Sequence, residues 1–338
     1  LYSWKIFRSS IEKGPSKTLC GGQAYKNGFA GAHPGHGVFH RRTVMNKQIK
    51  ADMMLLLVTA CWGVSYYLMD VSLTELGPFT LNAHRFLIAF AAAAVLSWPK
   101  LKSVNRITLK YSFYIGVCLV VVYIGATYGV MYTSLSNAGF LCALAVVITP
   151  VLAYFINREI PSEKLSLVVF MCIVGIGLLT LNEDLKPAVG DLLCIMCAVA
   201  YSVDLIITEK GVRKEEVNAY QLGVFQLGFT GLIQLLLAFV LEEPHFPVSR
   251  TVLASVLFLA VFCTGLAFIV QAVAQQYTSA THVGVIFTLE PVFAGFVAYF
   301  FASEVLLPRA YLGAVLLVAG CFIMEIDFKA LLARKKAA

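Results

Sequence analysis

Charged side chains are rare inside the long apolar runs of this sequence, so each of them is a candidate for chemistry. Glu290 stands near the middle of one such run and is followed by Pro291. A carboxyl group there can contact a cationic group of a ligand or carry a proton, at an insertion cost of roughly 2.5–3.5 kcal/mol for the charged form. We take Glu290 as the main candidate for ligand contact. The alternative is a protonated Glu290 that hydrogen-bonds to a neighbouring helix or to backbone freed by Pro291.

Aromatic and amide side chains could supply the rest of a binding site. Aromatic walls with a few placed polar groups suit amphipathic or cationic ligands. The candidate substrate-binding residues are Glu290, Trp62, Tyr66, Tyr123, Tyr201, Gln271, Thr288 and Arg85. For any single tyrosine, anchoring at the membrane interface or helix packing is an equal alternative.

Structural roles compete with function for two of the charged residues. Arg85 can snorkel or pair with Asp70 or Glu75. Asp204 falls near the end of its apolar run, where an ion pair with Lys210 or simple solvation is the preferred interpretation. The sequence has no zinc-protease or serine-hydrolase motif and no pair of catalytic carboxylates at suitable spacing. We therefore expect no enzymatic activity, no cofactor and no metal site.

The composition indicates that these residues belong to membrane helices. Of the 338 residues, 59% are hydrophobic and 13% are charged, whereas soluble domains have about 45–50% and about 25%. A helix that crosses the hydrocarbon needs roughly 20 mostly apolar residues, and lipid tolerates no unpaired backbone. We therefore predict an all-α polytopic membrane protein with ten transmembrane helices. They are expected near residues 52–70, 79–98, 110–132, 138–157, 164–182, 189–208, 217–240, 251–275, 279–301 and 309–326.

The distribution of lysine and arginine predicts the orientation in the cell membrane. With the N-terminus in the cytoplasm, 17 basic residues of the tails and loops fall on the cytoplasmic side and three, Lys186, Arg250 and Arg309, on the other. Cytoplasmic loops carry such an excess in membrane proteins. Both termini are therefore expected in the cytoplasm. The net charge of +7 is explained without nucleic acid.

The two halves of the chain resemble each other. Thr149-Pro150-Val151-Leu152-Ala153 lines up with Glu290-Pro291-Val292-Phe293-Ala294 at an offset of 141 residues. A five-helix unit repeated in tandem must enter the membrane from opposite sides, because five is odd. We expect two inverted five-helix repeats, with Pro150 and Pro291 kinking equivalent helices where transporters place their sites.

Four regions follow from these patterns. We expect a disordered or non-native N-terminal segment at residues 1–44, a first repeat at 51–182, a second repeat at 189–327 and a basic cytoplasmic tail at 328–338.

A set of short motifs resembles the EamA-type drug/metabolite transporter superfamily over residues 51 to about 327. The motifs are the run from Leu55 to Tyr66 with Trp62-Gly63, Arg85-Phe86, Tyr132-Thr133-Ser134, Asn137-Ala138-Gly139-Phe140-Leu141, Leu289-Glu290-Pro291-Val292-Phe293-Ala294, Glu304, Gly313 and Gly320. The resemblance implies a ten-helix inverted-repeat transporter, commonly an exporter of amino acids, metabolites or toxic compounds, with a central cavity lined by both halves. One departure is the absence of a Gly-Glu pair before Glu163, which weakens any role for that residue.

We therefore expect a secondary transporter that exports small metabolites, amino acids or drug-like compounds by alternating access. Without a Walker motif, energy would come from a coupling proton or ion, or from exchange. The expected partners are a small-molecule substrate and membrane lipid. The alternatives are an accessory or lipid-handling membrane subunit without a solute site and, third, an intramembrane enzyme.

Overall fold

The structure, a computed structural model, describes residues 34–132, 141–158, 162–180, 189–301 and 308–325. By its internal contacts the chain divides into Leu1–Asn46 and Lys47–Ala338, and the packing below concerns the second unit alone. Of residues 1–44, expected as a disordered or non-native segment, those from Pro34 onward are described as the first turns of a helix.

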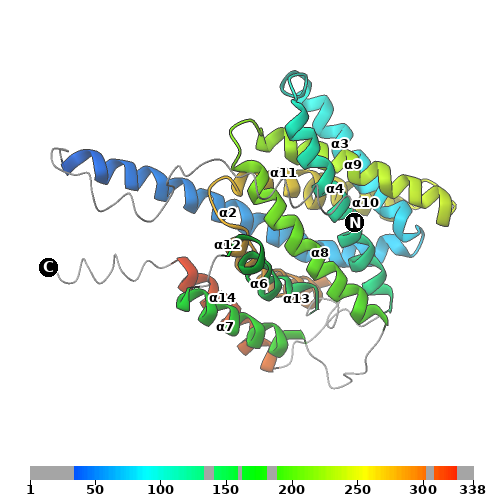
Figure 1. Cartoon of the computed structure of the whole chain (residues 1–338). Coiled ribbons are helices and arrows are strands. Elements are labelled where there is room, and N and C mark those ends of the chain that lie inside the picture. Colours follow the sequence, from blue (N-terminus) through cyan, green and yellow to red (C-terminus); the bar gives the residue numbers. More distant parts are fainter. Residues whose placement is uncertain (1–33, 133–140, 159–161, 181–188, 302–307, 326–338) are drawn as a thin grey trace. The chain divides into compact units, whose positions relative to one another are not determined.

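The described residues form helices and contain no strand, which confirms the all-α class. In chain order the helices are α2 (Pro34–Leu73), α3 (Pro78–Leu101), α4 (Arg106–Tyr132), α6 (Ala145–Asn157), α7 (Glu163–Thr180), α8 (Val189–Val212), α9 (Ala219–Leu241), α10 (Arg250–Phe258), the π-helix η1 (Leu259–Leu266), α11 (Ala267–Ala274), α12 (Ala280–Phe287), α13 (Glu290–Phe301) and α14 (Pro308–Glu325). Figure 1 shows them along the chain.

Seven helical stretches are long and apolar enough to cross a membrane, so this is a multi-pass membrane protein. They are Lys47–Leu73, Pro78–Leu101, Arg106–Tyr132, Val189–Val212, Ala219–Leu241, Arg250–Ala274 and Ala280–Val297. Two shorter apolar helices, Leu141–Ile156 and Tyr311–Met324, accompany them. Each of the ten predicted segments coincides with helical residues in the described part of the chain, and the count of ten crossings stays a prediction.

Polar side chains define where several helices begin. Asn218, Ser249 and Ser279 precede α9, α10 and α12. The side-chain oxygen of each accepts a hydrogen bond from the backbone N–H three residues on, at 3.1, 3.4 and 3.3 Å respectively. This pairing satisfies a donor that has no partner within the helix, which favours helix initiation at these positions.

The helices pack in pairs that are distant in sequence. α4 packs along α8, α3 along α9, and α7 along α14, the last pair lying side by side in Figure 1. Gly125 allows the close approach of α4 to α8, because a Cβ atom there would lie 2.6 Å from the carbonyl oxygen of Leu193. α6 contacts α8 and α12, α9 contacts α4 and α11, and η1 contacts α3.

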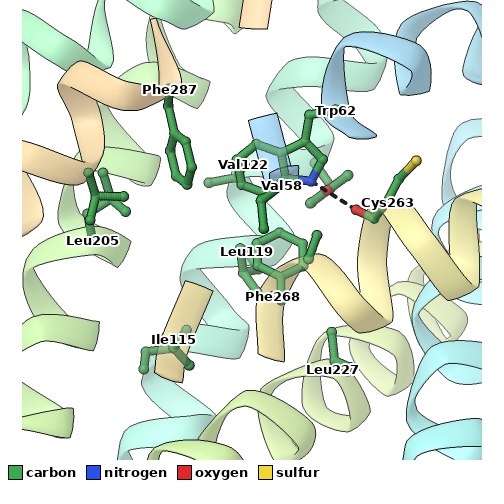
Figure 2. Packing of buried hydrophobic residues seen from close by; sticks show 14 of the residues in the cluster. Val58, Trp62, Ile115, Leu119, Val122, Leu205, Leu227, Cys263, Phe268 and Phe287 are labelled. Atoms are coloured by element: carbon green, nitrogen blue, oxygen red, sulfur yellow. Dashed lines mark hydrogen bonds between the residues drawn. The ribbon is translucent and has the colours of Figure 1, made fainter. Parts of the chain in front are cut away.

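Two clusters of buried side chains fill the helical unit. The larger is built from α2, α3, α4, α8, α9 and the helices from α10 to α12, and Figure 2 shows part of it around Trp62 and Phe268. The smaller lies between α6, α7, α12 and α14 and consists of Val146, Val168, Cys172, Ile176, Val285, Leu289 and Leu317. The candidate site residues fall mainly in the larger cluster.

Candidate functional site

The ninth predicted membrane segment is interrupted directly before Glu290. α12 ends at Phe287, a turn covers Thr288 and Leu289, and α13 begins at Glu290. Pro291 is thus in the first turn of a new helix, where a missing N–H leaves no hydrogen bond broken. The positive end of the α13 dipole favours an acidic side chain at this position.

The two predicted helix kinks differ in the structure. At Pro291 the chain breaks just before the proline, and a new helix starts. At its counterpart Pro150 helix α6 continues, and the turn lies earlier, at Leu144. Thr149 lies beside the proline and bonds the Ala145 carbonyl oxygen at 2.7 Å. The two halves therefore differ in where the chain turns relative to the proline.

Trp62 on α2 lies in the middle of the aromatic side chains. It is 6% exposed, and its indole N–H donates a 2.9 Å hydrogen bond to the Cys263 carbonyl oxygen, drawn as the dashed line in Figure 2. Its ring centroid lies 4.8 Å from that of Phe287, 5.5 Å from Phe268 and 5.9 Å from Tyr201. Trp62 thereby joins α2 to η1, α11, α12 and α8.

Three tyrosines interact with the Glu290 carboxyl group. Tyr66, one turn after Trp62, interacts with it directly, and Tyr123 and Tyr201 interact with it electrostatically. Tyr66, Tyr201 and Glu290 are half-buried, whereas Tyr123 is buried. Tyr66, Tyr201 and Glu290 are therefore less completely enclosed by the protein than Tyr123.

We name Trp62, Tyr66, Tyr123, Tyr201, Phe287 and Glu290 the central cluster. Gly63 allows α2 and α13 to approach closely at this cluster, because a Cβ atom there would lie 2.5 Å from Phe293 Cβ and 2.8 Å from the Ala294 nitrogen. The backbones of α2 and α13 thus meet next to Trp62 and Glu290.

The π-helix η1 supplies polar contacts beside this cluster. Its Cys263 carbonyl oxygen accepts the Trp62 bond, and its Thr264 hydroxyl accepts a 2.8 Å bond from Arg85 Nε. The wider turn of a π-helix removes carbonyl groups from the regular ladder, and such segments are frequent at functional sites. Nothing in the residue types of Leu259–Leu266 indicated this geometry.

Arg85 does not pair with either predicted acidic partner. It is 1% exposed, Nη1 contacts the Met69 sulfur at 3.3 Å, and Nη2 has no hydrogen-bond partner among the described residues. Its guanidinium lies 4.8 Å from the Tyr123 ring centroid, a cation–π arrangement. Glu75 instead accepts a 3.2 Å bond from the backbone of Ser249. Snorkelling is excluded as well, because the side chain is directed into the protein.

Gln271 and Thr288 lie outside the central cluster. Gln271 is 2% exposed and stands behind Tyr201, whose hydroxyl donates a 3.2 Å bond to its Oε1. Thr288 is 1% exposed, donates to the Val285 carbonyl oxygen at 2.7 Å and contacts the Cys172 sulfur at 3.6 Å. Thr288 therefore belongs with the smaller buried cluster.

The prediction that Asp204 is an interfacial residue is wrong. α8 continues to Val212, four residues beyond the predicted end, and Asp204 is only 1% exposed. Its side chain interacts with Gln271. The residue lies three positions after Tyr201, so a shared helix face was the signal that could have placed the two together.

Phe287 is the member of the central cluster that sequence reasoning missed. It precedes Glu290 by three residues and stacks on Tyr201, with centroids 6.2 Å apart and ring planes at 19°. A separate apolar groove of about 610 Å³ lies between α2 and α10 and contains none of the central cluster.

A helix interrupted within a membrane segment, as between α12 and α13, is found in several membrane transporters. A model of the EamA-like transporter family matches the chain twice, over residues 49–181 and 188–326. The chain therefore belongs to the EamA-like transporter family, which confirms the resemblance seen in its motifs, and it is a membrane transporter.

Proteins similar to this chain are also named as transporters. A protein of Archaeoglobus fulgidus named "uncharacterized transporter" is 28% identical over 83% of this chain and 87% of its own length. A protein of the same name from Methanothermobacter thermautotrophicus is 24% identical over 86% of this chain and 89% of its own length. A crystal structure with 19% identity matches with a TM-score of 0.69 over 86% of this chain and 99% of the other, so the two share a fold.

Proposed function

We propose that this chain is a secondary transporter that exports small metabolites, amino acids or drug-like compounds bearing a cationic group. The observation that carries the proposal is the half-buried Glu290, at the start of an interrupted helix and next to Trp62, Tyr66 and Tyr201. A carboxylate with aromatic faces around it attracts an amine or other organic cation. Export, as opposed to import, is taken from the family resemblance.

Both matched halves contribute to this site. Trp62, Tyr66 and Tyr123 come from the first family match, and Tyr201 and Glu290 from the second. A site at the junction of two repeats can open to either side when the repeats move relative to each other. We propose that alternating access occurs around a central cavity at this junction.

The pattern of helix contacts supports an inverted ten-helix repeat. Take the ten predicted spans in chain order and replace each by the span five places further on, counting round from the last to the first. The α4–α9 contact then becomes the contact between η1 and α3. The same operation turns the α6–α8 contact into that of α13 with α2, seen at Gly63 and Phe293. The α3–α9, α6–α12 and α7–α14 pairs map onto themselves. Such behaviour is expected of two related halves about a pseudo-two-fold axis.

Contacts between loops support the predicted sequence of crossings in the plasma membrane. On the predicted outer side, Glu242 accepts hydrogen bonds from the backbone N–H groups of Phe79 and Thr80 at 2.9 and 2.8 Å. Glu75 accepts one from Ser249 on the same side. Each pair joins positions that the distribution of basic residues assigns to one face.

The predicted cytoplasmic side has its own loop contacts. Gln221 donates a 2.7 Å bond to the Lys100 carbonyl oxygen, and the Ala280 N–H donates a 2.8 Å bond to Glu209. One missed or additional crossing between these positions would separate the partners across the membrane. Together with the distribution of basic residues, these contacts support our proposal that both termini lie in the cytoplasm.

The function is tested by ligand-dependent thermal stability of the full chain in detergent. The panel contains amino acids, amines, nucleosides and cationic dyes. A compound at about 100 times its Kd should stabilise by about 2.7 kcal/mol. We expect organic cations to stabilise the wild type and Glu290→Gln to lose the response while remaining folded.

Glu243→Gln is the matched control for that experiment, because Glu243 is an exposed loop carboxylate. It should respond like the wild type. A panel in which nothing binds would contradict the transporter site and favour an accessory subunit. Equal stabilisation of wild type and Glu290→Gln would remove Glu290 from the site.

Orientation is tested separately by fusing alkaline phosphatase or a fluorescent protein after Ala338 in bacterial cells. Phosphatase is active only outside the cytoplasm, so the proposal predicts fluorescence without phosphatase activity. The opposite result would place the C-terminus outside and contradict the topology.

A further inference from the structure

Asp204 is a second carboxyl group inside the helical unit, and it is not a member of the central cluster. It stands eight residues before the end of α8 at Val212, which is about 12 Å of helix at about 1.5 Å per residue. It is 1% exposed, and its Oδ1 has no hydrogen-bond partner among the described residues. An ionised carboxyl in such a place is costly unless it is paired or takes up a proton.

The groups that face Asp204 are few. On α11 the Gln271 amide interacts with the carboxyl. The titratable neighbours are the Cys118 thiol on α4 and the Tyr201 hydroxyl on α8 itself. From α6, α9 and α12, which also contact α8, no titratable or charged group is found against Asp204 within the described residues. The carboxyl therefore has no cation to balance it among these groups.

A chain of hydrogen bonds orients the Gln271 amide. Its Oε1 accepts the bond from Tyr201, and its Nε2 donates at 3.4 Å to Gln275 Oε1. Gln275 Nε2 in turn donates at 3.1 Å to the Leu205 carbonyl oxygen on α8. With its oxygen held by Tyr201, Gln271 presents its NH2 group to Asp204. An oriented donor of this kind stabilises the carboxylate, while the free Oδ1 can accept a proton.

Tyr201 belongs to both sites. Its ring stacks on Phe287 and meets Trp62 edge-on within the central cluster, and its hydroxyl orients Gln271. A ligand that displaces the ring would break the bond to Gln271 and so change the donor offered to Asp204. The substrate site and the buried carboxyl are connected through one side chain.

We propose that Asp204 is a proton-binding site of this transporter and that Tyr201 and Gln271 link its protonation to the central cluster. The step is the addition of one proton to the carboxylate at Oδ1, giving the neutral acid, with no other bond changed. The proposal rests on the proposed function for its role in transport, since a proton moved with or against the substrate would supply the energy.

The chemistry around Asp204 favours a proton over a metal cation. A sodium or larger ion needs several oxygen ligands around it. The groups found against Asp204 are instead an amide and a thiol, with the Tyr201 hydroxyl already donating to Gln271. Among the described residues no group of three or more metal-binding side chains occurs.

The proposal is tested by infrared difference spectroscopy of the full chain in proteoliposomes during pH steps. Protonation creates the carbonyl band of a carboxylic acid, which shifts in heavy water. We expect such a band in the wild type and in Glu290→Gln, and its loss when Asp204→Asn is added to Glu290→Gln. Asp204→Glu, which keeps the acid, should restore a shifted band and shows that loss is not due to misfolding.

The link to the central cluster has its own readout. Tyr201→Phe keeps the ring but no longer orients Gln271, so the proton affinity of Asp204 should rise about tenfold, as for one bond to a charged group. Gln271→Leu should act in the same direction. Tyr66→Phe is the matched control, because its hydroxyl interacts with Glu290. It should leave the midpoint of the Asp204 band unchanged.

Three results would overturn the proposal. They are a pH-dependent band that survives in the double variant Glu290→Gln/Asp204→Asn, a band assigned to Asp204 that responds to sodium at constant pH, and an Asp204 midpoint that moves equally in Tyr66→Phe and Tyr201→Phe. None of these measurements requires a substrate. Failure of the proposed function would appear instead as an absence of stabilisation by the ligand panel.

Discussion

Glu290 and Asp204 are two carboxyl groups in the same helical unit, and their surroundings differ in almost every respect. Glu290 begins a helix, is half-buried and interacts with tyrosines. Asp204 lies within a continuous helix, is 1% exposed and interacts with an amide. Exposure separates them, and we therefore propose a ligand contact for the first and a proton-binding role for the second.

The comparison shows that residue type alone does not define an intramembrane site. Both residues are acidic and both interrupt apolar runs, yet one faces aromatic rings and the other a hydrogen-bonded network. Tyr201 is the side chain that the two settings share. Substitutions at the two positions are therefore expected to have different effects.

The largest expected effect is at Glu290. Replacing its charge with the amide in Glu290→Gln removes a charge-assisted contact of about 1.5–3 kcal/mol, so the Kd of a cationic ligand should rise roughly 10- to 150-fold. Equilibrium binding of the best compound from the thermal panel measures this change.

Asp204→Asn serves as the contrasting variant in the same binding measurement at constant pH. It keeps Gln271 and Tyr201 and should alter the Kd much less than Glu290→Gln. Equal losses in the two variants would mean that the two carboxyl groups form one site.

The next effect concerns the close contact that places Trp62 near Glu290. Gly63→Ala adds a Cβ atom 2.5 Å from Phe293 Cβ, which forces α2 and α13 apart. Overpacking of this kind costs about 1–3 kcal/mol of stability. Thermal unfolding in detergent should show a lower Tm, together with weaker binding of the cation.

Gly284→Ala is the control, because its nearest neighbours, Thr149 Oγ1 and Val146 Cα, would lie 3.8 Å from the new Cβ atom. This variant should unfold at or slightly above the wild-type temperature, since alanine favours a helix over glycine. If both variants behave alike, close packing at Gly63 does not position the central cluster.

The smallest effect is expected for the indole hydrogen bond. Trp62→Phe keeps an aromatic ring but removes the donor to Cys263 O, a net loss of about 0.5–1.5 kcal/mol in stability. Trp98→Phe, at a position 59% exposed, should leave Tm unchanged. A Tm in Trp62→Phe equal to that of Trp98→Phe would show that the contact to η1 contributes little.

The sequence predicted much of the central cluster and little of its surroundings. Trp62 and Tyr66 are four residues apart, so helical spacing puts them on one face before any fold is known. That Tyr123, Tyr201 and Glu290 also meet them depends on helix pairing, which the repeat made predictable only in outline. All five residues are brought together in the structure.

The predictions that were wrong concern Arg85 and Asp204, whose contacts come from helices distant in the sequence. Asp70 and Glu75 are near Arg85 in sequence, but the guanidinium meets Thr264 of η1 instead, in a π-helix that the residue types do not indicate. Asp204 was placed at an interface because the apolar run ends early. The helix itself continues through Thr208 to Val212, and α4 and α11 cover the carboxyl.

We propose that a cationic ligand binds between Glu290 and the aromatic rings of both halves. The most direct test is an experimental structure of the full chain with the compound that stabilises it most. We predict the ligand cation about 2.7–2.9 Å from a Glu290 oxygen, with an apolar part against Trp62 and Tyr201. A ligand found in the apolar groove between α2 and α10, with Glu290 untouched, would contradict it.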